Sequence, residues 1–383
     1  MPDLAANMVE PVGGFEIHGM MLRYNLFVPK LYNWCISLGF KPGKIMPSRA
    51  FCSDESQGYP IIMIARHFGT FPFNHGRVGG IVATDRHGPH AAHGQDLVII
   101  QASHVGYDPQ TKTFGTYRRL QTTDQESGPS CGKISHIIDW YDDEYKFAQK
   151  NIHLHNNAGS ECVIIDNHLL REDLEDGLML RLDKLIETDL NKPRIPLEIL
   201  STSKVFNASH NLIQHIGADA FHNNQPTPID ANLTSDLFYF RRNVQSDEES
   251  GHHLEHNLVP YMPYIITRPS PILTAAQINT QIEFDRTFRT IVKEHGYLKK
   301  KVLFISGLHI DISPQEGQLF PLTKFVPWAA YIQDSDGSYR TMEQKELMQT
   351  LEQQSTSNSD TIDMESAIQS MADAKEVIVE TRV

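Results

Sequence analysis

Short apolar runs that lie far apart in the sequence constrain the fold of this chain most. Residues 97–100 are Leu-Val-Ile-Ile without polar alternation, which is typical of a strand buried on both faces of a sheet. Residues 302–306 and 326–332 predict two more strands near the other end of the chain. Because helical patterns lie between these strands, we expect a single α/β domain with a central mixed sheet flanked by helices.

Three segments have the spacing of packed helices. Apolar residues recur at three- and four-residue intervals in residues 15–40, with an expected interruption near Pro29. Leucines keep one face of residues 170–185, and a capping box begins an apolar stripe in residues 274–296. These patterns predict helices on the faces of the sheet.

Two stretches differ in composition from the rest of the 383 residues. Residues 207–264 are polar and rich in histidine, and we expect them to form an insertion or irregular region within a domain that covers residues 1–333. Residues 334–383 are rich in Gln, Ser, Glu and Met, which predicts a tail that is helical or partly disordered.

Charge and cysteine content limit the classes of function. Lys and Arg total 34 against 47 Asp and Glu, so the formal net charge is −13 and repels phosphate backbones and anionic lipid. We therefore expect no nucleic acid and no membrane among the partners. The four cysteines are too sparse for a disulfide framework, and no apolar run reaches the ~20 residues of a membrane span. These features predict a cytoplasmic protein without nucleotide chemistry, since phosphate-binding glycine motifs are also missing from the sequence.

Two cysteines and a histidine occupy turn-like positions next to predicted strands. They are Cys52, His104 and Cys131. Two thiolates and an imidazole supply three of the four ligands of a tetrahedral zinc ion and leave one position open, as in catalytic sites. Their spacing closes no local zinc finger, so unrelated buried thiols are the alternative.

Asp54 lies two residues after Cys52 and, in an extended segment, points to the same side. Its carboxylate could orient a metal-bound water or compete as the fourth ligand. An arginine fork would hold it off the metal, and the candidates are Arg66, Arg118 and Arg119.

Together these motifs resemble the limiting-CO2-inducible protein B family, a theta-class group of β-type carbonic anhydrase relatives. The resemblance extends from about residue 15 to residue 332. It rests on the order of six motifs: Cys52-Ser-Asp-Glu55, Ser103-His-Val-Gly-Tyr-Asp108, Tyr117-Arg-Arg-Leu120, Ser130-Cys-Gly132, Phe304-Ile-Ser-Gly-Leu-His-Ile-Asp311 and Trp328-Ala-Ala-Tyr-Ile332.

The resemblance implies a β-carbonic-anhydrase-like fold, a homodimer, and Zn2+ held by Cys52, His104 and Cys131. It also implies that zinc-bound hydroxide interconverts CO2 and bicarbonate, with Asp54 in an Asp–Arg dyad. In the wider β-type family the arginine lies two residues after the aspartate, where this chain has Ser56. Arg66 is then the best match. Light scattering that found a monomer would contradict the expected dimer.

Other functions fit the same residues. The chain could be a catalytically silent zinc-containing interaction protein, or a hydrolase of a CO2 isostere such as carbonyl sulfide. It could also be a thiol hydrolase with Cys52 or Cys131 as nucleophile and His104 as base. Five histidines near the predicted site could relay protons in a metalloenzyme, namely His67, His75, His87, His90 and His93.

Overall fold

The computed structural model describes residues 12–83, 96–118, 127–188, 194–222, 225–244, 252–318 and 320–375. The chain divides into two compact units. The core unit comprises Gly14–Cys131 and Thr280–Val383, and the intervening unit comprises Met1–Gly13 and Gly132–Asn279.

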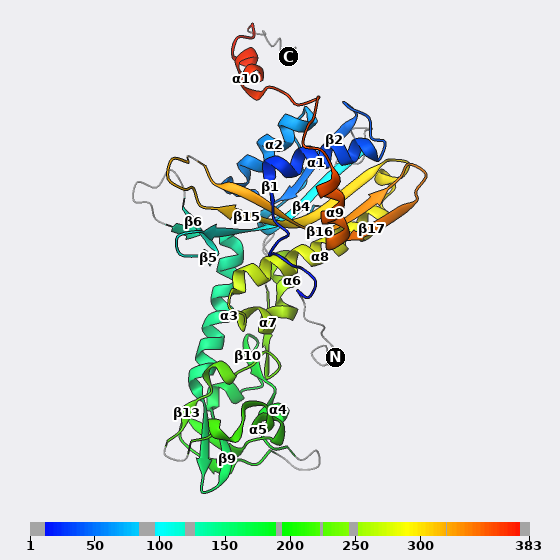
Figure 1. The fold of residues 1–383 in the computed structure, drawn as a ribbon. Coiled ribbons are helices and arrows are strands. Elements are labelled where there is room, and N and C mark those ends of the chain that lie inside the picture. The colour runs from blue at the N-terminus through cyan, green and yellow to red at the C-terminus, as the bar shows by residue number, and fades with distance from the viewer. Residues whose placement is uncertain are drawn as a thin grey trace, which may run out of the picture. The chain divides into compact units, whose positions relative to one another are not determined.

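A central mixed sheet forms the core unit (Figure 1). Its strands β15, β4, β2 and β3 run parallel, while β1, β16 and β17 are antiparallel additions at one side and β5 pairs with the end of β4. The order across the sheet is β1 (Leu22–Arg23), β16 (Leu322–Gln333), β15 (Val302–Ile312), β4 (Asp96–Asp108), β2 (Ile45–Phe51) and β3 (Phe73–Asn74). In addition, β17 (Tyr339–Glu343) pairs with β16, and β5 (Thr113–Phe114) pairs with β4. The predicted strands at 97–100, 302–306 and 326–332 are confirmed.

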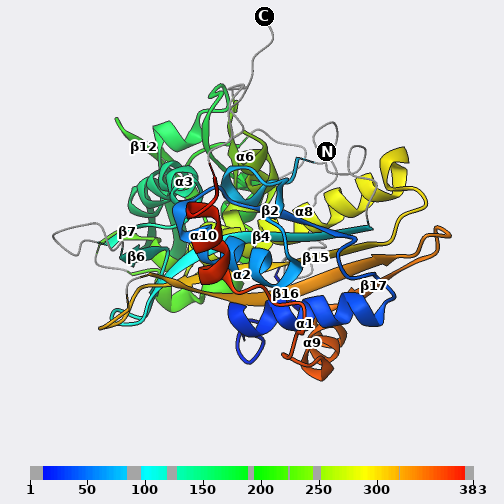
Figure 2. The ribbon, with the colours of Figure 1, turned by 90° about the horizontal axis from the view of Figure 1, so that it is seen from above.

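Helices cover both faces of this sheet, as expected from strands that are apolar on both sides. Val98 and Ile100 of β4 pack toward α1 (Tyr24–Ser37), α2 (Gly58–Phe68) and α9 (Gln344–Gln353). Their neighbours Leu97 and Ile99 pack toward the later turns of α8 (Pro271–Lys293). Figures 1 and 2 show α9 beside α1, where Lys30 Nζ donates to the carbonyl of Leu351.

Helix α1 continues through Pro29, so the interruption expected there is wrong. Proline inside a helix loses one backbone hydrogen bond and costs about 3 kcal/mol. Phe27, Val28 and Leu31 are fully buried against the sheet and offset this cost. The helix predicted in residues 274–296 is confirmed as α8.

The helix predicted for residues 170–185 is wrong. This segment contains β10 (Gly177–Leu180) and the single-turn α4 (Leu182–Leu185). Gly177 has φ +144°, which is incompatible with a helix, and β10 pairs with β14 (Phe238–Arg241) so that Leu178 is buried. Long-range pairing therefore overrides the leucine periodicity.

The intervening unit has its own five-stranded sheet and a long helix, α3 (Gly132–Asn151). The polar residues 207–264 contribute strands and helices to it. The order across this sheet is β11 (Glu198–Ile199), β12 (Ser203–Asn207), β9 (Ser160–Asp166), β8 (Ile152–Asn157) and β13 (Thr227–Pro228). The further helices of the unit are α5 (His210–Ile216), α6 (His252–Leu258) and α7 (Met262–Ile266).

The segment expected as a tail contains β17, α9 and α10 (Met364–Ala372). Leu347 and Leu351 of α9 are fully buried in the core unit. The domain limits at 333 and 334 stay a prediction. No helix in the described ranges has the length and apolar character that crossing a bilayer requires.

Candidate metal centre

Three side chains meet near the carboxyl end of β2: one follows this strand, one lies within the neighbouring parallel strand β4, and one follows a strand of the separate pair β6 (Thr116–Arg118) and β7 (Ser127–Pro129). Cys52 directly follows β2, His104 lies on β4, and Cys131 follows β7. Phe51 pairs with Ala102, so the end of β2 lies beside the His104 segment. The ligand atoms of all three residues lie within 4.8 Å of one another, and all three side chains are buried. The three residues predicted as metal ligands therefore lie close together in the structure.

The histidine in this cluster fits a metal ligand. Nδ1 of His104 lies 2.9 Å from Oδ2 of Asp311, and Nε2 has no hydrogen-bond partner in the described part of the chain. A buried, unpaired ring nitrogen costs free energy unless something binds it. Together with two cysteine sulfurs, this nitrogen forms the ligand set that zinc prefers, so the group could hold a metal ion.

The cluster favours ionisation of the Cys52 sulfur but not of the Cys131 sulfur. A hydrogen bond from Cys131, helped by His104 and the Gly79 N–H, lowers the pKa of Cys52 and outweighs burial, while the same bond and burial raise the pKa of Cys131. Burial alone would lower the pKa of His104, but Cys131 and Asp311 raise it well above its usual value. The ligand atoms of His104 and the two cysteines lie within 4.8 Å of one another, close enough for the thiols to raise the pKa of the imidazole. The protons held here are those that a metal ion would displace.

A glycine turn covers the cysteine end of the cluster. In η3 (Val78–Gly80), the Gly79 N–H donates to Cys52 Sγ at 3.2 Å. A Cβ at Gly76 would lie 2.1 Å from the Phe51 carbonyl oxygen, and one at Gly80 would lie 2.4 Å from that of Ala102. Only glycine lets this turn approach the two ligand-bearing strands so closely.

Glu283 of α8 fastens the end of this turn. Its carboxylate accepts the Val82 N–H at 2.9 Å and pairs with Arg286 at 2.6 Å. Glu283 is fully buried, so this hydrogen bond links the end of the turn to α8 away from solvent. Nothing in the sequence pattern predicted this contact.

Asp54 and Arg66 are not joined in the structure. Oδ1 of Asp54 accepts the Ser56 N–H at 3.1 Å and begins the 3-10 turn η2 (Glu55–Gln57). Arg66 is exposed on α2, and its carbonyl accepts the Ile362 N–H. Neither a hydrogen bond nor an ion pair between the two side chains occurs among the described residues. The Asp–Arg dyad stays a prediction.

Among the described residues, the other arginine candidate, Arg118, has different partners. The backbone N–H of Arg118 donates to Ser313 Oγ at 3.0 Å, and its guanidinium donates to the Pro314 carbonyl. Arg119 lies outside the described residues.

Sequence reasoning missed the buried carboxylate of the site. Asp311 is fully buried on β15 and contacts His104, Ser56 and Gln57. It ends one of the motifs that carry the family resemblance, but nothing in its spacing to Cys52 or His104 predicted a role. The parallel pairing of β15 with β4 brings it there.

Two of the five proposed relay histidines lie in the described part of the chain, and they make separate hydrogen bonds. His75 is buried with Nδ1 3.2 Å from Ser48 Oγ, and His67 bonds to the C-terminal segment through Asn358 and Thr361. His87, His90 and His93 lie outside the described residues. His67 is therefore engaged in fastening residues 358–362 to α2.

We predict that acid loosens this C-terminal segment. Burial, helped by the nearby Arg66 charge, lowers the pKa of His67 to about 4, below the 6.5 of an unperturbed histidine. Neutral His67 then contributes its full stabilisation above pH 6.5, and that stabilisation falls as the pH drops toward 4. Hydrogen exchange of the Ile362 amide, corrected for intrinsic rates, should show more opening at pH 5 than at pH 7.5. A His67→Gln variant should lose this pH dependence; equal behaviour of the two proteins would contradict the prediction.

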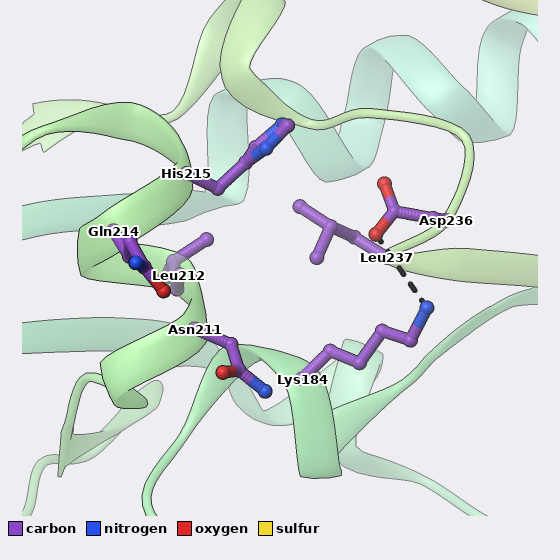
Figure 3. Close-up of a pocket in the computed structure, with 7 residues that line it drawn as sticks. All are labelled: Lys184, Asn211, Leu212, Gln214, His215, Asp236 and Leu237. Carbon is purple, nitrogen blue, oxygen red and sulfur yellow. Dashed lines mark hydrogen bonds and ion pairs between the residues drawn. The ribbon is translucent and has the colours of Figure 1, made fainter.

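A separate cavity of about 430 Å³ lies in the intervening unit (Figure 3). Lys184 and Asp236 face each other across one side of it at 3.5 Å, and His215 of α5 lines another side. It contains none of the predicted site residues, so it is distinct from the Cys–His–Cys cluster.

The protein is therefore of the α/β class, with a mixed sheet and a candidate metal centre that lies near the carboxyl end of β2 and includes a histidine of β4. No family model matches the sequence, and no curated protein matches it. Among solved structures, the chain is similar to PtLCIB4, a homolog of the limiting CO2-inducible protein LCIB, with 12% identity, a TM-score of 0.50, and coverage of 87% of this chain and 97% of that one.

The solved limiting CO2-inducible protein LCIB itself is also similar, with 12% identity, a TM-score of 0.45, and coverage of 85% and 95%. The resemblance that the motifs indicate is therefore confirmed in the fold, through the similarity to PtLCIB4. The expected mixed sheet flanked by helices is confirmed with it.

Proposed function

We propose that the chain holds one zinc ion at Cys52, His104 and Cys131 and interconverts CO2 and bicarbonate. The observation that supports this most is the convergence of two buried sulfurs and a buried, unpaired imidazole nitrogen within 4.8 Å. Zinc with three protein ligands supplies a water of lowered pKa, which is the nucleophile that CO2 hydration needs at neutral pH.

In this proposal the chain's own residues bind, orient and exclude water. Gly79 N–H steadies the Cys52 sulfur, and Asp311 fixes the ring of His104. The three candidate ligands are buried, which strengthens electrostatic interactions among them. Asp54, held at the start of η2 two residues after Cys52, is the carboxylate proposed to orient the reacting water.

The test is CO2 hydration measured against zinc content. Stopped-flow assays at pH 7 and pH 8.5 should show hydration in proportion to bound zinc, with loss on chelation and recovery on adding Zn2+. Activity should favour the higher pH, because two thiolates donate more negative charge to the metal than neutral ligands would. If the chain binds one zinc ion but the rate of CO2 hydration does not exceed that of the buffer, the enzymatic proposal is wrong.

A second candidate, a catalytically silent zinc-containing protein, has a specific observation in its favour. Ser56 stands where the wider β-type family has its arginine, and it is buried with Oγ donating to Asp311 at 3.0 Å. Arg66, the candidate partner of Asp54 that the family resemblance matches best, is exposed. Full zinc occupancy without hydration is the result that this candidate predicts.

A further inference from the structure

We propose that Asp311 is the positioning residue of the metal centre, and that it fixes His104 with Nε2 directed at the two cysteine sulfurs. This inference rests on the proposed zinc site but not on the CO2 chemistry. It assigns a role to a buried carboxylate that the ligand set itself does not include.

Hydrogen-bond chemistry determines which nitrogen of His104 faces the sulfurs. The Asp311 carboxylate only accepts hydrogen bonds, so Nδ1 of His104, 2.9 Å from Oδ2, must be the donor. The lone pair of the neutral ring is then on Nε2, which is buried and unpaired within the described ranges. A carboxylate on the far nitrogen also makes the ligating nitrogen more basic.

Donors surround Asp311 and hold it in place. Oδ2 accepts from Ser56 Oγ at 3.0 Å and from Gln57 Nε2 at 2.7 Å, while Oδ1 accepts from Thr323 Oγ1 at 3.0 Å. With His104, four donors converge on a fully buried carboxylate. Such a group is costly to bury unless it is fully hydrogen-bonded, and here it is.

His309 fixes the orientation of Gln57. Because the Gln57 amide nitrogen faces the carboxylate, its oxygen is left for Nδ1 of His309 at 2.5 Å. The His309 ring is held between aromatic neighbours Tyr24 and Phe51. A continuous path of hydrogen bonds therefore runs from His309 through Gln57 and Asp311 to His104.

Strand register builds this path. In the parallel pair β15 and β4, His309 lies opposite His104 and Asp311 lies opposite Gly106. Residues two apart share a face, so Asp311 projects from the same face as both histidines. Ser56 and Gln57 reach it from the 3-10 turn that follows Cys52. Ser56 and Gln57, which follow Cys52 in the chain, thus hold the Asp311 carboxylate that orients His104.

Zinc affinity of an Asp311→Asn variant tests the proposal. Asparagine keeps the shape and one acceptor oxygen but removes the charge that supports the His104 N–H. Competition with a chelator should show zinc affinity lowered about 10- to 100-fold. The matched control is Asp108→Asn, which changes another buried, hydrogen-bonded carboxylate in β4 that does not touch the ligands. The control should bind zinc as tightly as the unchanged protein.

The outcomes separate this inference from the proposed function. Unchanged zinc affinity in Asp311→Asn, or an equal loss in both variants, would overturn the positioning role. If the protein without any substitution binds no zinc, both the proposed metal site and this inference are wrong. Zinc binding without CO2 hydration would reject only the carbonic anhydrase proposal.

A spectroscopic measurement on the unchanged sequence covers the case in which Asp311→Asn does not fold. In 113Cd-loaded chain with 15N-labelled histidine, cadmium should couple to Nε2 of a single histidine whose Nδ1 carries a slowly exchanging proton. Coupling through Nδ1, or a rapidly exchanging Nδ1 proton, would overturn the proposal.

Discussion

Cys131→Ser is expected to abolish zinc binding at the stoichiometric level and, with it, CO2 hydration. A serine hydroxyl is a far weaker ligand than a thiolate at neutral pH, and Cys131 is one of the three protein ligands that converge here within the described residues. Zinc affinity should fall by more than about 100-fold, beyond the usual effect of removing a residue that only supports a ligand. Zinc counting after dialysis and stopped-flow hydration measure both effects on the same preparation.

Cys35→Ser is the matched control for this variant. Cys35 is a fully buried thiol of α1 in the same core unit and is not part of the metal cluster. It should keep zinc and activity, apart from any loss of stability. Equal zinc content in Cys131→Ser and the unchanged protein would refute the metal site. An unchanged protein without zinc whose Cys52 reacts rapidly with iodoacetamide would instead favour the thiol-hydrolase alternative.

Gly80→Ala is expected to destabilise the core unit by about 2–4 kcal/mol, the sum of left-handed backbone strain and overpacking. Gly80 has φ +80°, and a Cβ there would lie 2.4 Å from the Ala102 carbonyl oxygen. Relief of this overlap would move the turn away from the strands and take the Gly79 N–H away from Cys52. Urea unfolding should report the loss of stability, and chelator competition a weaker hold on zinc.

Gly43→Ala separates strain from steric overlap. Gly43 has φ +68°, but nothing lies within 4 Å of a Cβ built on it. This control should cost only about 1–2 kcal/mol, the strain of a left-handed alanine, and should leave zinc affinity unchanged. If both variants lost the same stability and kept the same zinc affinity, the turn would have no part in holding the centre.

The three candidate ligands were predictable from their side-chain types and from motifs whose order resembles a known family, but their wide spacing in the sequence does not by itself predict that they meet. The pairing of Phe51 with Ala102 brings Cys52 beside the His104 segment. The role of Asp54 was harder to predict from alternation. Alternation assumes an extended segment, whereas the chain turns into η2 directly after Asp54. The exposed face of α2 likewise depends on which side packs on the sheet, and that leaves Arg66 in solvent.

Sequence patterns were enough to predict the strands that are buried on both faces, the helix α8, and three residues that could bind a metal. These features depend on side-chain chemistry and on short periodic patterns that need no distant partner. Long-range packing was needed to show that α1 continues through Pro29, that residues 177–180 pair as a strand, and that Asp311 contacts His104. His104 and Asp311 are 207 positions apart, and only the register of two parallel strands brings them within hydrogen-bond distance.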